Sequence, residues 1–316
     1  MKLSDLGERK LIERMGELLD IGDDAACIKI GDGFLVVSTD MIYRKTHILN
    51  EMSFAQAGHK IVSMCFSDIA SMGAKPAGFL LSYGSADIDF ADFDELIKGA
   101  KEQAERYGAG FIGGDTNETD ELTLAGTALG FADKPVFRKG AKPGEVVGVT
   151  SDLGSAALGV KVLLEKMVPL SEIPADILQR TLDPEPRVRE GILLGNYASA
   201  MMDISDSLAV SLHEIAERSR VRIEVRVENV PFSKSALELG DKFGIDILEQ
   251  GLYGGGDYEL LFTASEERWD ELKDEFSRRD LVKVTKIGRV VEGSGASCVK
   301  DGKEFGIRRE GYEHFR

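Results

Sequence analysis

Apolar and polar residues recur along the chain in two periods, one typical of strands and one typical of helices. Short apolar runs rich in branched and aromatic residues predict strands at 34–37, 77–83, 110–112, 122–131, 146–149, 200–204, 221–227 and 258–262. Apolar positions at helical spacing predict helices at 1–20, 53–72, 91–107 and 207–218, with two more beginning after Gly154 and Pro186. Strands and helices therefore alternate in both halves, which predicts an α/β (α+β) fold.

The segment 134–144 contains Pro135 and Pro143 and interrupts this alternation. A chain of 316 residues exceeds the usual size of a single domain. We therefore predict two α/β domains, residues 1–137 and residues 138–316. The charged, amphipathic N-terminal segment indicates a helix, not a signal peptide.

Six short acidic phrases recur along the chain, and most of them stand where an apolar run ends or a helix begins: Gly22-Asp23-Asp24, Ser38-Thr39-Asp40, Ser67-Asp68, Gly113-Gly114-Asp115-Thr116, Asp203-Ile204-Ser205-Asp206 and Gly255-Gly256-Asp257. We expect their carboxylates to gather at the ends of the elements. Magnesium prefers oxygen ligands and is usually held by a few carboxylates together with substrate phosphates. The phrases therefore predict a site for several Mg²⁺ ions and a nucleotide, with phosphoryl transfer as its chemistry.

Asp68 is the most informative of these acids, because it lies inside a predicted helix near Met64 and Met72. A buried carboxylate requires a partner charge. Any single Asp at the end of a strand is an ordinary turn or cap residue. Four or five carboxylates packed together without cations would raise one another's pKa values and destabilise the fold.

The common phosphate-binding motifs are absent: the chain has no GxxxxGK[ST] loop and neither an HRD nor a DFG triplet. Gly108, Gly110 and Gly113 spell GxGxxG. A predicted helix precedes them, however, whereas a dinucleotide fingerprint follows a strand. If the chain is a kinase, it belongs to neither large class.

A formal charge of −16 argues against nucleic acid or an anionic membrane as the main partner. The few cations near the acidic phrases, Arg44, Lys45, His47, Arg138, Lys139 and Lys142, could neutralise a substrate phosphate. Three separated cysteines without a CxxC pair fit a reducing compartment, so we expect a cytoplasmic protein. No uncharged apolar run approaches the roughly 18 residues of a membrane span.

The acidic phrases, together with Ser67–Pro76, Arg138–Gly144 and the final Gly311-Tyr312-Glu313-His314-Phe315, resemble the thiamine-monophosphate kinase family from end to end. Its superfamily also includes aminoimidazole ribonucleotide synthetase, selenophosphate synthetase and a hydrogenase-maturation ATPase. The resemblance implies a homodimer whose N-terminal domains pair their sheets into a barrel, each followed by a C-terminal α/β sandwich domain. It also implies transfer of the γ-phosphoryl group of ATP to thiamine monophosphate, giving thiamine diphosphate.

The resemblance also implies roles for individual residues. The positions that match metal ligands are Asp24, Ser38, Thr39, Asp40, Asp68, Asp115, Asp203 and Asp206. Those that match ATP contacts are Tyr107, Gly114, Asp115, Arg138 and Ser205, and those that match substrate contacts are His47, Gly256 and Tyr312. Direct transfer between two phosphates needs metals and positioning more than it needs a strong base or a nucleophile.

Two positions depart from the family pattern. Gly256 stands where the family usually has glutamate, and Ser207 stands where it usually has glycine. Three alternatives therefore remain open: a ligase resembling aminoimidazole ribonucleotide synthetase, a kinase for another small phosphate acceptor, and a nucleotide-binding dimer without turnover. Selenophosphate synthetase is disfavoured, because Cys27 lies in a strand-like stretch and not in a flexible loop.

Overall fold

The computed structural model describes residues 2–19 and 21–315, and it contains two sheets, one from each half of the chain. The first sheet has the strand order β1-β2-β5-β3-β4. The elements of this half are η1 (Leu3–Asp5), α1 (Glu8–Gly16), β1 (Ala26–Ile30), β2 (Gly33–Tyr43), α2 (Arg44–His47), α3 (Phe54–Ser71), β3 (Lys75–Ser85), α4 (Phe90–Arg106), β4 (Gly110–Glu118) and β5 (Thr123–Ala132).

The second sheet has the order β12-β11-β8-β10-β6-β9-β7. Its half contains β6 (Val146–Thr150), α5 (Ser155–Leu164), η2 (Leu170–Glu172), α6 (Ala175–Leu182), α7 (Val188–Leu194), β7 (Ala198–Ile204), α8 (Leu208–Ser219), β8 (Arg222–Arg226), η3 (Val227–Asn229), α9 (Lys234–Phe243), α10 (Ile247–Tyr253), β9 (Glu259–Ala264), η4 (Glu266–Arg268), α11 (Trp269–Arg278), β10 (Val284–Val291), β11 (Gly295–Lys300) and β12 (Lys303–Gly306). The predicted two-domain α/β fold is confirmed. The boundary between residues 137 and 138 falls in the connection from β5 to β6 and stays a prediction.

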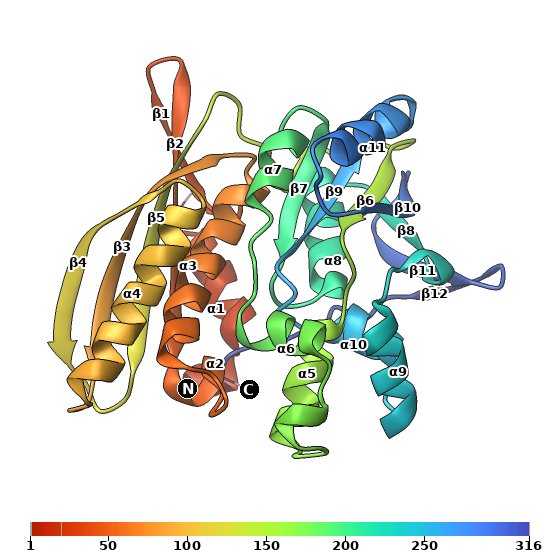
Figure 1. Cartoon of the computed structure of the whole chain (residues 1–316). Helices are drawn as coiled ribbons and strands as arrows, with labels where there is room; N and C mark the ends of the chain where they lie inside the picture. The colour runs from red at the N-terminus through yellow and green to blue at the C-terminus, as the bar shows by residue number, and fades with distance from the viewer. Residues whose placement is uncertain (1, 20, 316) are drawn as a thin grey trace.

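Helix α3 lies between the two sheets and touches elements of both domains (Figure 1). Its start is fixed by a capping box: Ser53 Oγ accepts the Gln56 N–H, and the Gln56 side chain accepts the Ser53 N–H. Its apolar positions are buried along most of its length. The helix that carries Asp68 is therefore a rigid support shared by both domains.

Helices α3 and α4 approach closely because Gly58 has no side chain at their contact. A Cβ added at Gly58 would lie 2.2 Å from the Leu96 carbonyl oxygen. We expect Gly58→Ala to force the helices apart and to lower the melting temperature by several degrees, since such overpacking costs about 1–3 kcal/mol. Gly16→Ala in α1 is the control, because the nearest atom there is 3.9 Å away. Equal melting temperatures of the two variants would contradict this packing argument.

Three predicted boundaries were wrong. The predicted strand 34–37 continues as β2 to Tyr43, and the predicted strand 110–112 continues as β4 to Glu118. Ser38 and Asp40 occupy inward positions of β2, so the alternation of inward and outward side chains continues beyond Val37. The strand continues because its backbone stays paired with β5, although the inward side chains are polar. The predicted helix 1–20 is reduced to η1 and α1, and residues 1 and 20 lie outside the described residues.

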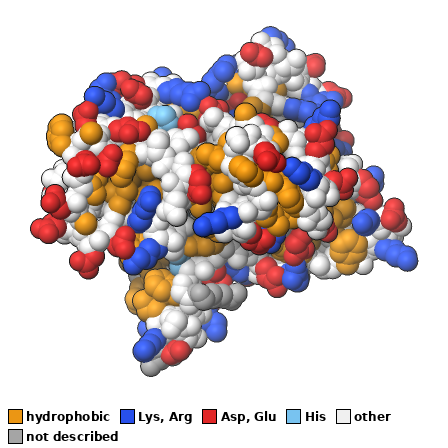
Figure 2. Space-filling model, turned by 60° about the horizontal axis from the view of Figure 1, so that its bottom comes forward, with side chains coloured by type: hydrophobic (Ala, Val, Ile, Leu, Met, Phe, Trp, Pro, Cys, Tyr) orange, Lys and Arg blue, Asp and Glu red, His pale blue; other side chains and the backbone are white. Residues whose placement is uncertain are grey.

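Helices α3 and α4 cover one face of the first sheet and leave the other face uncovered (Figure 1). Strand register places five exposed apolar side chains on that face: Ile28, Ile30, Met41, Ile112 and Phe131. Elsewhere on the molecule, the face drawn in Figure 2 mixes acidic and basic side chains around hydrophobic ones. Among the described helices, none has the length and apolar character needed to cross a membrane.

Candidate active site

Three carboxylates from distant parts of the chain converge where α3 meets β7. Asp24 precedes β1, Asp68 lies in α3, and Asp203 lies in β7. Ligand oxygens of these three residues all lie within 4.8 Å of one another. We call these residues the carboxylate cluster. Both domains contribute to it, as the acidic phrases predicted.

Serine hydroxyl groups hold two of the three carboxylates in place. Ser38 Oγ donates to Asp68 Oδ2 at 2.5 Å, and Ser67 Oγ donates to Asp203 Oδ2 at 2.7 Å. Asp40 is two residues beyond Ser38 on the same inward face of β2. Among the described residues, the buried atoms Asp24 Oδ2 and Asp40 Oδ2 have no hydrogen-bond partner.

The electrostatics of the cluster are unfavourable without a cation. Burial raises the pKa of Asp68, and the neighbouring Asp40, Asp203 and Asp24 raise it further. Burial is also the main cause of the raised pKa values of Asp203 and Asp40. Unpartnered carboxylate oxygens with disfavoured charges suit a hard cation, and a few carboxylates with a hydroxyl are typical Mg²⁺ ligands. The residues present therefore fit magnesium.

Arg138 connects the segment between the domains to the cluster. Its Nη2 and Nε atoms donate to Asp24 Oδ1 at 2.5 and 3.1 Å, and its backbone N–H donates to Asp23 Oδ1 at 2.7 Å. Its Nη1 lies 3.6 Å from Glu214 Oε2. The guanidinium is thus placed beside the cluster, where a phosphate could exchange with Asp24 as its partner.

Two predicted metal ligands, Thr39 and Asp115, do not turn their side chains toward the cluster, and Gly114 lies with Asp115. The Thr39 side chain points to the opposite face of β2 and donates to the Gly126 carbonyl oxygen at 2.8 Å, so only main-chain atoms of Thr39 face the cluster side. Gly114 and Asp115 lie in β4, which β5 and β3 separate from β2. At a strand spacing of about 4.8 Å, β4 is about 14 Å from β2. The sequence predicts that these residues belong to the site, but it does not show that two strands separate β4 from β2.

The second-domain loops come together as predicted. The Gly256 N–H donates to the Ser205 carbonyl oxygen at 2.7 Å, next to Asp206. Burial, with a contribution from Glu8, raises the pKa of Asp206 to about 6. A Cβ at Gly256 would meet only Ala156 Cβ, at 3.7 Å, but the φ of +90° disfavours any L side chain there. The backbone at this position suits glycine, not the glutamate of the family pattern.

The two predicted substrate residues also meet. The ring centroids of His47, at the end of α2, and Tyr312 are 6.2 Å apart. Burial, together with the charges of Lys60 and His314, lowers the pKa of His47 to about 4. The imidazole of His47 is therefore uncharged at neutral pH. Tyr107, predicted to contact ATP, lies apart from these rings and packs edge-on against Phe66 at 6.1 Å.

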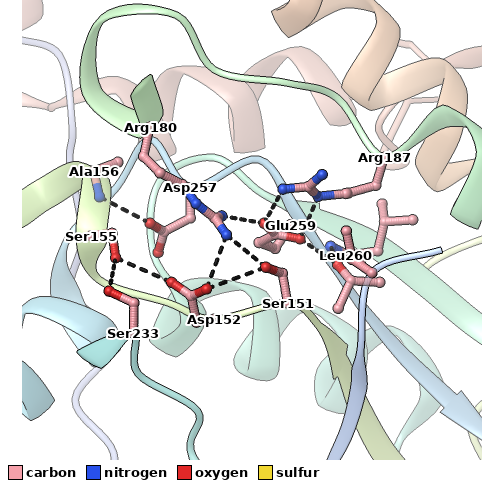
Figure 3. A network of polar contacts seen from close by, with 12 residues as sticks. Ser151, Asp152, Ser155, Ala156, Arg180, Arg187, Ser233, Asp257, Glu259 and Leu260 are labelled. Carbon is pink, nitrogen blue, oxygen red and sulfur yellow. Dashed lines mark hydrogen bonds and ion pairs between the residues drawn. The ribbon is translucent and has the colours of Figure 1, made fainter. Parts of the chain in front are cut away.

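Beside Asp257 lies a buried polar network that the sequence did not predict (Figure 3). The fully buried Glu259 accepts hydrogen bonds from Arg187 Nε and Nη2, both at 2.7 Å, and from Arg180. Arg180 Nη2 also donates to Ser151 Oγ and Asp152 Oδ2. Asp257 accepts the Gly154 and Ala156 N–H groups at 2.7 and 3.3 Å. The two hydrogen bonds of Asp257 to the start of α5 therefore hold the loop that carries Gly256.

Lys60 was also missed, although the sequence holds a signal for it. It precedes Asp68 by eight residues, which places both side chains on one face of α3. Its Nζ donates to the His47 carbonyl oxygen at 2.8 Å, and burial lowers its pKa to about 8. By contrast, the residues that bond to Glu259 lie up to 109 residues from it in the sequence, so no local pattern predicts the network.

Comparisons with known proteins agree with this arrangement. Residues 22–132 match the family model described as AIR synthase related protein, N-terminal domain, and residues 142–301 match its C-terminal counterpart. Thiamine-monophosphate kinase of Pyrococcus horikoshii is 34% identical over 318 residues, covering 99% of this chain and 98% of the relative. That of Methanospirillum hungatei is 38% identical over 299 residues, covering 92% of each.

Solved structures give the same result. A structure described as AaThiL complexed with AMPPCP and TMP has a TM-score of 0.91 and 31% identity, and the match covers 99% of each chain. Thiamine monophosphate kinase of Aquifex aeolicus, solved separately, has a TM-score of 0.85 at 30% identity, over 97% of this chain and 100% of that one. With its two AIR-synthase-related domains, the chain therefore belongs to the thiamine-monophosphate kinase family.

Proposed function

We propose that this protein transfers the γ-phosphoryl group of ATP to the phosphate of thiamine monophosphate, giving thiamine diphosphate and ADP in a magnesium-dependent reaction. The observation that carries the proposal is the convergence of Asp24, Asp68 and Asp203 between the two domains. It is supported by the similar structure described as a complex with AMPPCP and TMP.

Asp24, Asp40, Asp68, Asp203 and Asp206 would hold the magnesium ions, with the Ser38 hydroxyl and the main chain of Thr39 as further ligands. Magnesium held there would supply positive charge that offsets the repulsion between the two phosphates. The protein itself supplies fixed oxygen ligands, because Ser38 and Ser67 orient two of the carboxylates.

The remaining residues position the two substrates. Arg138 would bind a nucleotide phosphate, Ser205, Gly114 and Tyr107 would contact the nucleotide, and His47 and Tyr312 would contact the thiamine moiety. The acceptor phosphate oxygen is already ionised near neutral pH, so in-line transfer needs positioning and charge stabilisation more than a general base.

We also propose that the active form is a homodimer. The uncovered face of the first sheet presents the five exposed apolar side chains Ile28, Ile30, Met41, Ile112 and Phe131, and a second copy would bury them by closing the two sheets into a barrel. Asp115 lies on that uncovered face, because it pairs with Ser82, which pairs in turn with Ala125. In such a dimer, Asp115 and Gly114 could serve the site of the second copy.

The direct test uses purified protein, ATP, Mg²⁺ and thiamine monophosphate, with chromatographic separation of thiamine diphosphate and ADP. We expect both products in a one-to-one ratio. Thymidine monophosphate and a sugar phosphate serve as alternative acceptors. They are included because Gly256 replaces the usual family glutamate, so another small phosphate could be the acceptor. If ADP forms faster with another acceptor, that acceptor replaces thiamine monophosphate as the proposed substrate. If no acceptor gives turnover, the nucleotide-binding dimer is favoured.

Magnesium and nucleotide should bind as one unit. Because the carboxylates repel one another without a cation, we expect Mg²⁺ together with a non-hydrolysable ATP analogue to raise the melting temperature by more than the sum of the two separate shifts. Differential scanning fluorimetry measures this, with Ca²⁺ and the analogue as a comparison. Strictly additive shifts would show that the metal and the nucleotide do not share a site.

A further inference from the structure

The side chain of Arg138 is held from two sides, by Asp24 at the cluster and by Glu214 of helix α8. Its Nε and Nη2 atoms donate to Asp24 Oδ1, and its Nη1 lies 3.6 Å from Glu214 Oε2. The side chain of Glu214 is 16% exposed and that of Arg138 is 21% exposed. The guanidinium therefore lies in a largely buried place between two carboxylates, and only one of these belongs to the carboxylate cluster.

Glu214 is itself held by two further arginines. Arg309 Nη2 donates to Glu214 Oε1, and Arg218, one turn further along α8, has its Nε 3.8 Å from Glu214 Oε2. Arg218 also lies against the loop that carries Asp24, since a Cβ added at Gly22 would be 2.5 Å from Arg218 Nη1. Contacts on both of its oxygens therefore fix the carboxylate of Glu214 beside Arg138.

The main chain around Arg138 is fixed as well. Its N–H donates to Asp23 Oδ1 at 2.7 Å, and the Gly140 N–H donates to Ser219 Oγ, at the end of α8, at 3.0 Å. The freedom that remains is the rotation of the long Arg138 side chain. Glu214 restricts that rotation, because it pairs with the far end of the guanidinium.

We infer that Glu214 is a positioning residue for the nucleotide: it holds Nη1 of Arg138, so that the edge formed by Nε and Nη2 faces the carboxylate cluster and can bind a phosphate. This inference rests on the proposed function. A planar guanidinium binds a phosphate through two parallel hydrogen bonds, which requires the plane to be oriented. Without Glu214, the binding of a nucleotide would have to order the Arg138 side chain.

The charges around Glu214 allow it to lie near a phosphate site without repelling the phosphate. Arg218 and Arg309 offset its negative charge. It pairs with Nη1, which does not belong to the edge that donates to Asp24. Burial opposes the charge of Arg138, but Asp24 and Glu214 outweigh burial and raise the pKa of Arg138. The guanidinium therefore stays charged, as a phosphate partner must be.

The test measures the steady-state kinetics of Glu214→Gln, whose amide keeps the shape of the side chain and removes its charge. We expect the KM for ATP to rise about tenfold, or about 1.4 kcal/mol. The kcat and the KM for thiamine monophosphate should stay unchanged, because an oriented Arg138 binds ATP alike before and during transfer. A purely structural loss would lower the amount of active enzyme, and hence kcat, with both KM values unchanged.

A double-mutant cycle shows whether Glu214 acts through Arg138. Calorimetry measures the affinity for the ATP analogue AMPPCP with Mg²⁺ in wild type, Glu214→Gln, Arg138→Ala and the double variant. Once the guanidinium is absent, Glu214→Gln should weaken binding no further. Additive losses in the double variant would overturn the inference.

Glu217→Gln is the matched control on the same helix. Glu217 pairs with Arg309 at 3.0 Å, but its side chain is 65% exposed, and in the described part of the chain this is its only ion pair. We expect the control to keep the wild-type KM for ATP. An equal rise in both variants would show that the charge of α8, not the hold on Arg138, affects the nucleotide. If Glu214→Gln fails to fold, Glu214→Met, which has a similar shape, replaces it.

The outcomes distinguish this inference from the proposed function. Wild-type protein that makes thiamine diphosphate, with an unchanged KM for ATP in Glu214→Gln, would overturn the role of Glu214 and keep the kinase. Wild-type protein that binds AMPPCP with Mg²⁺ but phosphorylates no thiamine monophosphate would overturn the kinase, and the double-mutant cycle would then decide the role of Glu214. A wild-type chain that binds no nucleotide would overturn both.

Discussion

Asp68→Asn should abolish phosphoryl transfer and, at the same time, stabilise the metal-free protein. The amide keeps the shape of the side chain but removes the charge that would bind magnesium. Since metal assistance contributes several kcal/mol, we expect kcat/KM to fall by about a thousandfold or more. An assay of thiamine diphosphate formation at saturating magnesium measures the loss.

The gain in stability follows from the raised pKa of Asp68, which burial and the neighbouring carboxylates cause. The unfolded chain releases this proton at a lower pH than the folded chain does. The metal-free wild type therefore loses stability as pH rises above the ordinary carboxyl pKa of about 4. Asp68→Asn, which is neutral at every pH, should melt several degrees higher than wild type at pH 8 and at the same temperature near pH 4.

Asp270→Asn is the matched control, because its carboxylate is 88% exposed and pairs only with Lys273 in the described contacts. We expect this control to keep full activity and its response to magnesium with nucleotide. An active Asp68→Asn enzyme, or one that melts lower than wild type at pH 8, would remove Asp68 from the metal site.

Glu259→Ala should be the most destabilising single change in the second domain. It leaves Arg180 and Arg187, whose side chains are only 18% and 11% exposed, without their shared carboxylate. Removing one partner of a buried ion pair costs about 3–5 kcal/mol. At about 2–4 °C per kcal/mol, the melting temperature should drop by roughly 10 °C. Calorimetry measures the shift.

The loss of stability in Glu259→Ala should be larger at neutral pH than in acid. Burial opposes the charge of Glu259, but Arg187 and Arg180 outweigh it and lower the pKa. A lowered pKa contributes stability above the ordinary glutamate value of about 4.3, and this contribution disappears as the pH falls through the folded-state pKa. The difference between wild type and Glu259→Ala should therefore shrink in acid.

Glu249→Ala is the control for this experiment, because the ion pair between Glu249 and Arg308 is about half exposed on both sides. Exposed pairs contribute at most about 1 kcal/mol. Equal losses of melting temperature in the two variants would contradict the stabilising role of the buried network.

The sequence predicted features that depend on local spacing and missed those that depend on contacts between distant residues. Helix α3 follows its apolar period closely, and its capping box is local. β2 and β4 were cut short because Ser38, Asp40 and Asp115 are polar, although an extended strand accepts them once its backbone pairs with a neighbour.

The same distinction holds at the site. The meeting of Asp24, Asp68 and Asp203 could be predicted. Asp24 and Asp203 lie near the ends of strands, and Asp68 is a carboxylate inside an apolar helix that needs a partner charge. The sequence does not predict that the Thr39 side chain faces away from them, because this depends on strand register. Nor does it predict that Asp115 lies across the sheet, because this depends on strand order. His314 lies two residues beyond the predicted Tyr312, but its contact with the His47 ring follows from the course of the C-terminal segment along α1.

The most direct test of the metal and nucleotide site is a crystal structure of the protein with Mn²⁺, a non-hydrolysable ATP analogue and thiamine monophosphate, phased with the anomalous signal of manganese. We predict anomalous peaks about 2.1 Å from carboxylate oxygens of Asp24, Asp68 and Asp203, between the phosphates of the two ligands. Manganese bound elsewhere, with these three carboxylates free of metal, would contradict the account.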